Sequence, residues 1–232
     1  VDAVIRAAST WFGPIKKRTA ADENLNAERG PVFPSGKSRH IAVPTKIEKG
    51  LAEVAYPTDD FWDIHKTRRL SVLSEVMADR MRIKIREQMG AAYSYHAYNS
   101  ASRAYPGYGV FHAMVEIAPE DSQAVIEAVE SIAADLADKG VSRNERDRAV
   151  KPVLSSIRER VKTNSYWLNS VLKGASRHPQ QLEWSRSFLS DYQSITAGEL
   201  SRLAKKYLDN PAAARLIITP AGDGAPEGGK GS

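Results

Sequence analysis

Apolar residues recur between residues 60 and 86 at steps of three and four, which is the repeat of one helical face. The recurring positions are Leu70, Leu73, Met77, Met81 and Ile85, and Val72, Val76 and Ile83 widen the face. A face of this width is typical of a helix that lies against a sheet. The pattern therefore predicts one long helix from about Asp60 to Arg86, with the methionines in the core.

Strand patterns lie on both sides of this helix. Short apolar runs occupy residues 41–43 and 51–56, and residues 91–100 and 107–117 read as a hairpin. In the second hairpin strand an apolar set alternates with a mixed one: Phe111, Ala113, Val115 and Ile117 against Val110, His112, Met114 and Glu116. This alternation predicts a sheet that is covered by helices on one side only.

The remaining segments are mostly helical. Helices are predicted at residues 2–12, near 124–136, from 142 onward, near 166–175, near 180–189 and from 196 to about 208, with a closing strand at 213–219. Asp2 is a plausible N-cap for the first helix. Ser142 with Glu145, and Thr196 with Glu199, have the spacing of capping boxes. Pro152 should kink its helix or end the helix's first segment.

This order of elements predicts an α+β fold, with a mainly antiparallel sheet and helices packed on one face. Residues 1–20 are interpreted as the trailing helix of a preceding unit, and residues 21–40, which contain several Pro and Gly, as a linker. Residues 41–220 are predicted to form the α+β domain itself. Residues 221–232, rich in Gly, Pro and Ser, are expected to be disordered.

Composition adds few constraints. The chain has 232 residues, 42% hydrophobic and 26% charged, as in ordinary globular proteins, and no apolar run approaches a membrane span. It contains no cysteine, which excludes disulfides and cysteine-bound metal. The net charge is +5, and the densest basic set lies on the long helix. We interpret that set, Arg68 included, as a solvated face balanced by nearby acids, although a basic nucleic-acid-binding module remains an alternative.

Few residues have the spacing of a catalytic site. His112 and Glu116 share one face of a strand, but two ligands do not make a metal site, and a structural or solvent-facing pair is favoured. His65 is interpreted as an exposed or capping residue. The junction at residues 83–98 is more informative, because it places Arg86 at a helix end, Gly90 at a turn and Tyr93 at the start of a strand. The arginine and the tyrosine could hold a carbonyl or a carboxylate; alternatively, Arg86 binds the last carbonyls of its helix and Tyr93 is core.

The run Arg-Glu-Gln-Met-Gly-Ala-Ala-Tyr-Ser at residues 86–94 resembles a motif of the C-terminal half-domain of the pitrilysin/insulinase family of zinc metallopeptidases. The resemblance extends over about residues 1–220. It includes Val1–Arg18, Leu51–Pro57, Gly107–Pro119, Gly140–Glu145 and Leu208–Pro220. In this family the zinc signature is His-x-x-Glu-His, which the chain lacks.

The resemblance implies a zinc-free, non-catalytic half-domain that encloses and orients a peptide substrate. It implies that Arg86 and Tyr93 bind the substrate backbone and that this chain holds no catalytic residue and no metal. Zinc is then expected in an N-terminal catalytic half, on the same chain or on a separate subunit. The parent protein would be a metalloendopeptidase, and this domain alone no enzyme. Neither a membrane nor a nucleic acid is an expected partner. The periplasm is preferred over the cytoplasm. The rival within the same fold is a structural core-type subunit without a protease role.

Overall fold

The protein is described by a computed structural model that covers residues 1–14, 30–209 and 211–221, with all side chains in these ranges except those of Ala92 and Tyr93. The chain divides into two compact units, residues 1–32 and residues 33–232. The first unit contains helix α1 (Asp2–Phe12). Val1, rather than Asp2, is its N-cap, and no side chain caps it, so Asp2 acts as an acid in the first turn. The predicted linker from residue 15 to 29 and the tail from 222 to 232 lie outside the described residues.

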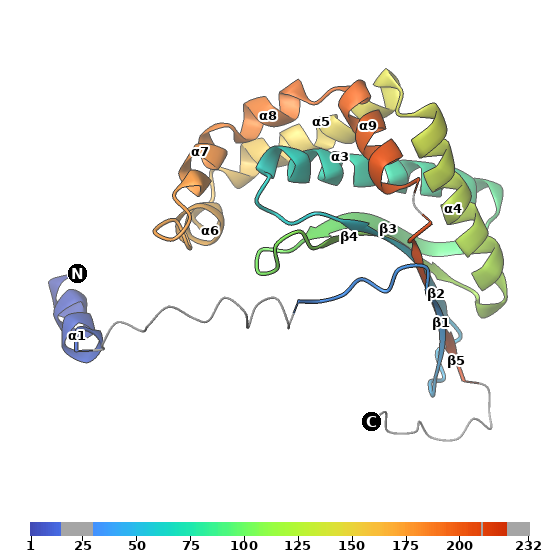
Figure 1. Cartoon of the computed structure of the whole chain (residues 1–232), viewed down its shortest axis with the longest axis horizontal. Coiled ribbons are helices and arrows are strands. Elements are labelled where there is room, and N and C mark those ends of the chain that lie inside the picture. The colour runs from blue at the N-terminus through green and yellow to red at the C-terminus, as the bar shows by residue number, and fades with distance from the viewer. Residues whose placement is uncertain (15–29, 210, 222–232) are drawn as a thin grey trace. The chain divides into compact units, whose positions relative to one another are not determined.

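The second unit is built on one mixed, five-stranded sheet with the order β1-β5-β2-β4-β3 (Figure 1). Its strands are β1 (Ser38–Val43), β2 (Gly50–Thr58), β3 (Ala92–Ala101), β4 (Gly109–Ile117) and β5 (Ala214–Pro220). Only the β1–β5 pair is parallel, so the sheet is mainly antiparallel, as the sequence predicts. β1 begins at Ser38, inside the range interpreted as linker. The sequence hides this start because Ser38, Arg39 and His40 are polar and owe their strand conformation to pairing with β5.

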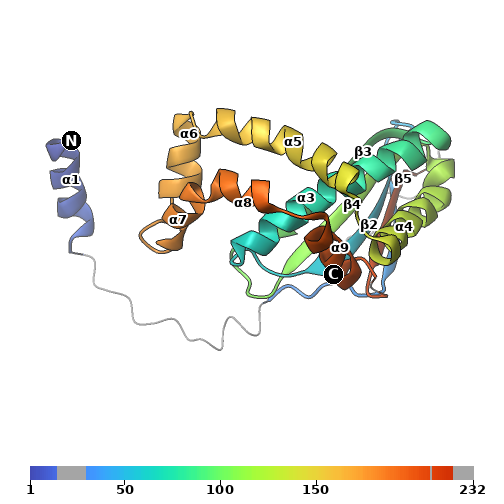
Figure 2. The ribbon, with the colours of Figure 1, turned by 90° about the horizontal axis from the view of Figure 1, so that it is seen from above.

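The helices cover one face of this sheet (Figures 1 and 2). They are α3 (Ile64–Met81), η1 (Arg82–Gln88), η2 (Pro119–Asp121), α4 (Ser122–Lys139), α5 (Arg143–Arg160), α6 (Asn164–Tyr166), η3 (Trp167–Leu172), α7 (Gln180–Arg186), α8 (Phe188–Ser194) and α9 (Ala197–Tyr207). α3 packs against β3, and α4 packs against β2. The α+β architecture with helices on one face is therefore confirmed.

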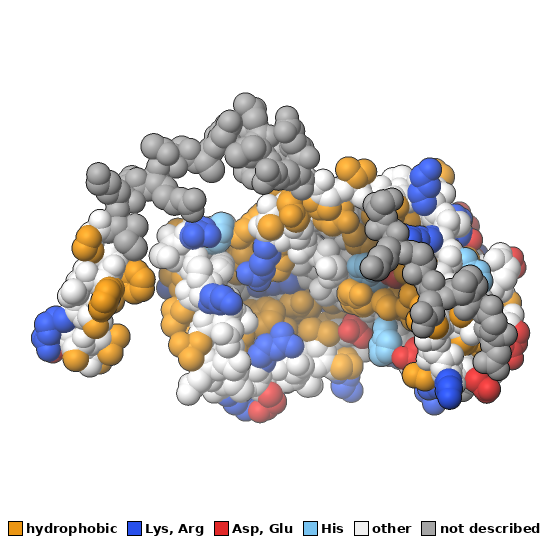
Figure 3. All heavy atoms as spheres, turned by 90° about the horizontal axis from the view of Figure 1, so that it is seen from below, with side chains coloured by type: hydrophobic (Ala, Val, Ile, Leu, Met, Phe, Trp, Pro, Cys, Tyr) orange, Lys and Arg blue, Asp and Glu red, His pale blue; other side chains and the backbone are white. Residues whose placement is uncertain are grey.

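The core lies between α3, α4 and the covered face of the sheet. Leu70, Leu73, Met77, Met81 and Ile85 of the predicted helical face are all buried, and Ile83 is half-buried. The alternation in β4 is confirmed too, because Phe111 and Val115 are fully buried while Glu116 is exposed. Figure 3 views the face of the sheet that lies away from α3 and α4. Apolar side chains gather there around a hollow of about 590 Å³.

Local signals fix the helix ends. The two capping boxes, Ser142 with Glu145 and Thr196 with Glu199, are both present. α3 begins at Ile64 with Asp63 as its N-cap, four residues later than predicted from Asp60. Pro152 does not end α5, which continues to Arg160. Proline lacks the N–H that would bind the carbonyl four residues earlier in the helix. Because Pro152 is exposed, water can reach that carbonyl, and we attribute the continuity of α5 to this.

Candidate functional site

The candidate site is the junction between the long helix and β3. The sequence predicts a regular helix to Arg86, but the α-helix ends at Met81 and a π-helix, η1, continues to Gln88. The backbone N–H of Met89 donates to the carbonyl of Lys84 at 3.2 Å, the longer span of a π-turn. π-turns are rare, recur at functional sites and change the direction in which the following side chains point.

Gly90 makes the turn out of η1. Its φ is +67°, in the left-handed region that L side chains rarely adopt, while a Cβ there would meet no atom within 4 Å. The backbone conformation, rather than lack of space, therefore requires glycine at this position. The N–H of Ala91 then donates to the carbonyl of Ile85 at 3.2 Å and closes the junction.

Arg86 lies on the last turn of η1 and is exposed. Its two basic neighbours are held by the protein. Arg82 pairs with Asp79 at 2.8 Å and with Glu87, and Lys84 donates to the hydroxyl of Ser131 at 2.8 Å. Within the described part of the chain Arg86 has no hydrogen bond or ion pair, and in particular it does not bind the carbonyls of its own helix. Its guanidinium is thus the one in this turn that is open to an external acceptor.

Tyr93 lies at an irregularity of β3. Ala92 pairs with Ile117 and Ser94 with Glu116, so Tyr93 is the extra residue of a β-bulge. Bulges re-aim side chains and are common at sheet edges and beside active sites. β3 is one of the two edge strands of this sheet. The backbone thus places Tyr93 three residues beyond the Gly90 turn, and its side chain lies outside the described part.

The two histidines singled out from the sequence, His112 and His65, make structural contacts in this unit. His112 Nδ1 lies 2.5 Å from Glu53 Oε1, and its ring stacks on Tyr98 with 4.6 Å between centroids, while Glu116 is exposed. His112 therefore contacts an acid across the sheet rather than the one four residues along its own strand. His65 is 64% exposed and bonds Asp191 at 2.9 Å. Among the described residues no three His, Cys, Asp or Glu side chains are grouped so as to hold a metal ion.

The interpretation of Arg68 as part of a solvated basic face is wrong. Arg68 is 5% exposed and pairs with Asp191 at 2.8 Å, and Arg69 binds the other oxygen of the same carboxylate at 2.9 Å. Burial opposes ionisation of Asp191, but hydrogen bonds from Arg69, His65 and Arg68 outweigh it and lower the pKa of this carboxyl. Asp191 lies more than 120 residues from both arginines in the sequence. The sequence interpretation paired the basic residues only with acids close to them in the chain, so it missed this carboxylate. The available signal was the position of Arg68, four residues after Ile64 and four before Val72 on the buried stripe.

The comparison with family models identifies one family. The model of the family described as "Peptidase M16 inactive domain" matches residues 1–153. The comparison with curated proteins gave no match.

The fold is similar to several solved structures. A peptidase M16 inactive domain from Pseudomonas fluorescens has 18% identity and a TM-score of 0.74, over 97% of this chain and 52% of that one. The periplasmic protease PqqL from Escherichia coli has 15% identity and a TM-score of 0.71, over 95% of this chain and 24% of that one. The ferredoxin protease FusC, solved with Arabidopsis ferredoxin, has 13% identity and a TM-score of 0.72, over 94% of this chain and 24% of that one. At these identities the likeness shows the fold alone, and this chain spans only a quarter to a half of each protein.

Proposed function

This chain belongs to the family of peptidase M16 inactive domains, and from that premise we propose that it orients a peptide for cleavage by a separate zinc half. The observation that carries the proposal is the state of Arg86. In a turn where Arg82 and Lys84 are engaged by protein groups, Arg86 is exposed and has no partner in the described structure. An unpaired guanidinium beside a rigid glycine turn is a donor ready for a peptide oxygen.

Arg86 and Tyr93 act together in this proposal. They stand on the two sides of the Gly90 turn, one on a π-helix and one in a β-bulge, both of which are backbone irregularities that serve to aim side chains. Both residues donate hydrogen bonds, and neither suits acid–base chemistry at neutral pH. Their role is therefore to hold the substrate backbone and to stabilise charge that develops on its carbonyl.

The partners follow from this role. We propose that the zinc and its His-x-x-Glu-His ligands lie in a catalytic half, on the same polypeptide or on another subunit, and that the substrate is a peptide or protein. FusC, described as a ferredoxin protease and solved with ferredoxin, supports a protein substrate for a protein of this fold. We favour the periplasm, which PqqL supports as a periplasmic protease. No described helix of this chain is long and apolar enough to cross a membrane.

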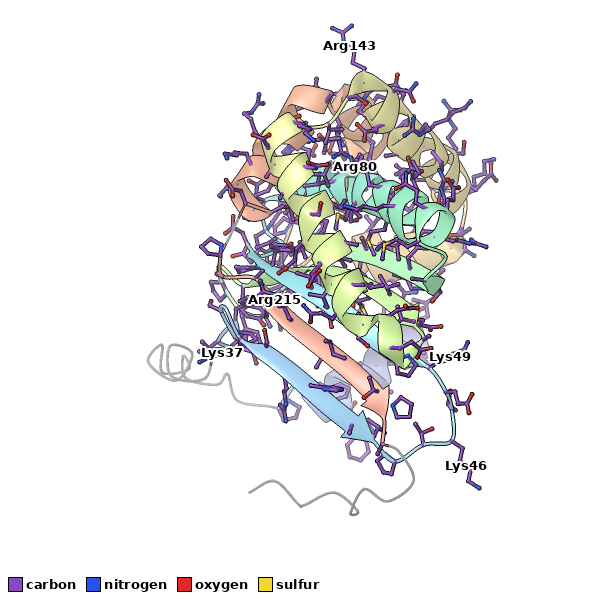
Figure 4. All side chains as sticks on the ribbon, turned by 90° about the vertical axis from the view of Figure 1, so that its right-hand side faces the viewer. Lys37, Lys46, Lys49, Arg80, Arg143 and Arg215 are labelled. Carbon is purple, nitrogen blue, oxygen red and sulfur yellow. The ribbon has the colours of Figure 1, made fainter. Side chains whose placement is uncertain are left out.

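A nucleic-acid-binding role finds little support in the placement of basic side chains. Figure 4 shows the six labelled ones spread over the unit, from Arg143 at one end to Lys46 at the other, with only Lys46 and Lys49 in the same loop, between β1 and β2. Two of them are neutralised, since Arg80 pairs with Glu145 at 2.7 Å and Arg215 pairs with Glu130. Scattered and paired cations do not form the continuous basic stripe that a nucleic acid requires.

The proposal is tested by Arg86→Ala and Tyr93→Phe in the complete peptidase. Each should lower kcat/KM by roughly a hundred- to a thousandfold, the usual effect of losing one donor to a developing oxyanion. Arg143→Ala is the matched control, because Arg143 is also an exposed arginine near a helix end and points away from the body of the unit (Figure 4). Zinc content and melting temperature should stay unchanged in all three variants.

The kinetic outcome separates the alternatives. A fall in kcat indicates a contact that tightens in the transition state, and a rise in KM indicates a contact made equally in the ground state. Wild-type kinetics in both variants would make the pair structural and would favour the core-type subunit. A loss of several degrees in melting temperature for Tyr93→Phe would instead show that this tyrosine belongs to the core.

A further inference from the structure

A second cavity of the second unit has the composition of a binding site. It measures about 240 Å³ and is lined by residues from the start of α3, the loop between β3 and β4, the end of α5 and the segment from α6 to α8. Five aromatic side chains line it: Phe61, Tyr166, Trp184, Phe188 and Tyr192. Three arginines line it as well, and none of its described lining residues is acidic.

Arg68 forms the floor of this cavity. Its terminal nitrogens bind Asp191 at 2.8 Å and the carbonyl of Trp184 at 2.6 Å, and its guanidinium lies 5.1 Å from the centre of the Phe188 ring. The Nε–H group of Arg68, however, has no acceptor in the described structure, and nearby Gln181 Oε1 has no donor. Both side chains are at least 95% buried, and an unsatisfied buried polar atom costs stability unless a ligand or a water completes it.

Arg103 and Arg160 line the cavity, are exposed and lack an acid partner among the described residues. Arg103 lies over the ring of Phe61, 3.9 Å from its centroid, and burial lowers the pKa of this guanidinium. Burial raises the pKa of Tyr166, while the charges of Arg68 and Arg160 oppose the rise, so both arginines lie within electrostatic reach of the cavity. Asp191, which pairs with Arg68 beneath the cavity, is already shared with Arg69. The cavity therefore carries an uncompensated positive charge.

We infer that this cavity binds the C-terminal residue of a peptide, with its free carboxylate on Arg103 and Arg160 and an aromatic or large apolar side chain against the ring walls. Planar guanidinium groups match a carboxylate, and the rings supply apolar contact. A terminal residue also brings both kinds of hydrogen-bonding group that the floor lacks, an acceptor for Arg68 Nε–H and a backbone N–H for Gln181. This site lies beyond the Arg86–Tyr93 site and rests on the proposed function only in taking a peptide as its ligand.

The test is a calorimetric titration of this chain with three probes: N-acetyl-phenylalanine, its uncharged amide and inorganic phosphate. The acid should bind saturably, with a dissociation constant on the order of 1 mM, as is usual for a ligand of this size. The amide and phosphate should each bind at least about tenfold more weakly, because one lacks the charge and the other the apolar body.

Variants then locate the binding. Arg103→Gln and Arg160→Gln should each weaken the acid about five- to tenfold. Arg158→Gln is the matched control, since Arg158 is exposed on the same helix, two residues away, and does not line the cavity. Equal binding of acid and amide, equal binding of acid and phosphate, or unchanged affinity in both cavity variants would each overturn the inference. Because this titration needs no zinc half, its failure leaves the Arg86–Tyr93 proposal standing, and a failure of that proposal leaves this one.

Discussion

Asp191 is the residue whose substitution the structure predicts most sharply. Its side chain is 4% exposed and joins α8 to α3 by accepting hydrogen bonds from Arg68, Arg69 and His65. The change Asp191→Asn keeps the shape of the side chain and one acceptor oxygen but removes the charge. It would leave Arg68, itself 5% exposed, without a counter-ion in the interior.

The stability cost of Asp191→Asn depends on which contacts the three basic side chains keep. Breaking a buried ion pair from one side costs about 3–5 kcal/mol. Two features reduce this cost, because Arg69 keeps its pair with Glu199 at 2.8 Å and His65 can turn to water. We therefore expect a loss of about 2–4 kcal/mol, which for a unit of this size lowers the melting temperature by roughly 5–12 °C.

Calorimetry across pH gives the assay. The pKa of Asp191 is lowered in the folded chain, so its charge stabilises the fold above the unfolded pKa, and this stability is lost as pH falls through the folded value. The difference in melting temperature between wild type and Asp191→Asn should be constant from about pH 7 to 5 and should become smaller below about pH 4. Asp135→Asn, which breaks an exposed pair with Lys139, is the control and should leave the melting temperature unchanged. A fall in melting temperature of less than about 2 °C for Asp191→Asn would show that Arg68 does not depend on this carboxylate.

Three further predictions concern other parts of the chain. Hydrogen bonds from Lys66 and Tyr207 outweigh burial and lower the pKa of Asp59 to about 2, so Asp59→Asn should cost about 1 kcal/mol at pH 7 after discounting for its exposure. That cost should vanish as pH falls from about 5 toward 2, and an equal cost in urea titrations at pH 7 and pH 2 would contradict the assignment. The chain lacks His-x-x-Glu-His, so dialysed protein should contain far less than one zinc per chain by elemental analysis, and about one tightly held zinc would overturn this. The apolar side chains of α1 are exposed, Trp11 at 78% and Phe12 at 69%, so light scattering should show self-association at high concentration, and a clean monomer would count against it.

Features set by short-range patterns were predictable from the sequence. The stripe from Leu70 to Ile85 predicted the long buried helix, and the spacing of Ser142 and Glu145 predicted a capping box that the structure contains. In each case the deciding interaction joins residues at most four apart or one face of one element.

Features set by distant contacts were not predictable in the same way. The π-helix after Met81 is hidden because Met81 and Ile85 keep the apolar spacing of an α-helix. The burial of Arg68 depends on Asp191, and the cavity above it joins Phe61 to Trp184 from across the chain. In the candidate site, Gly90 makes the turn that the sequence suggests and Arg86 lies at a helix end, while the substrate-binding roles of Arg86 and Tyr93 stay predictions.

The most direct test of the central claim is a structure of the complete peptidase with a peptide bound and the glutamate of its zinc signature replaced by glutamine. We expect the Arg86 guanidinium and the Tyr93 hydroxyl within about 3 Å of a backbone oxygen beside the scissile bond. An ordered peptide at the zinc with both side chains beyond about 4 Å from its backbone would contradict it.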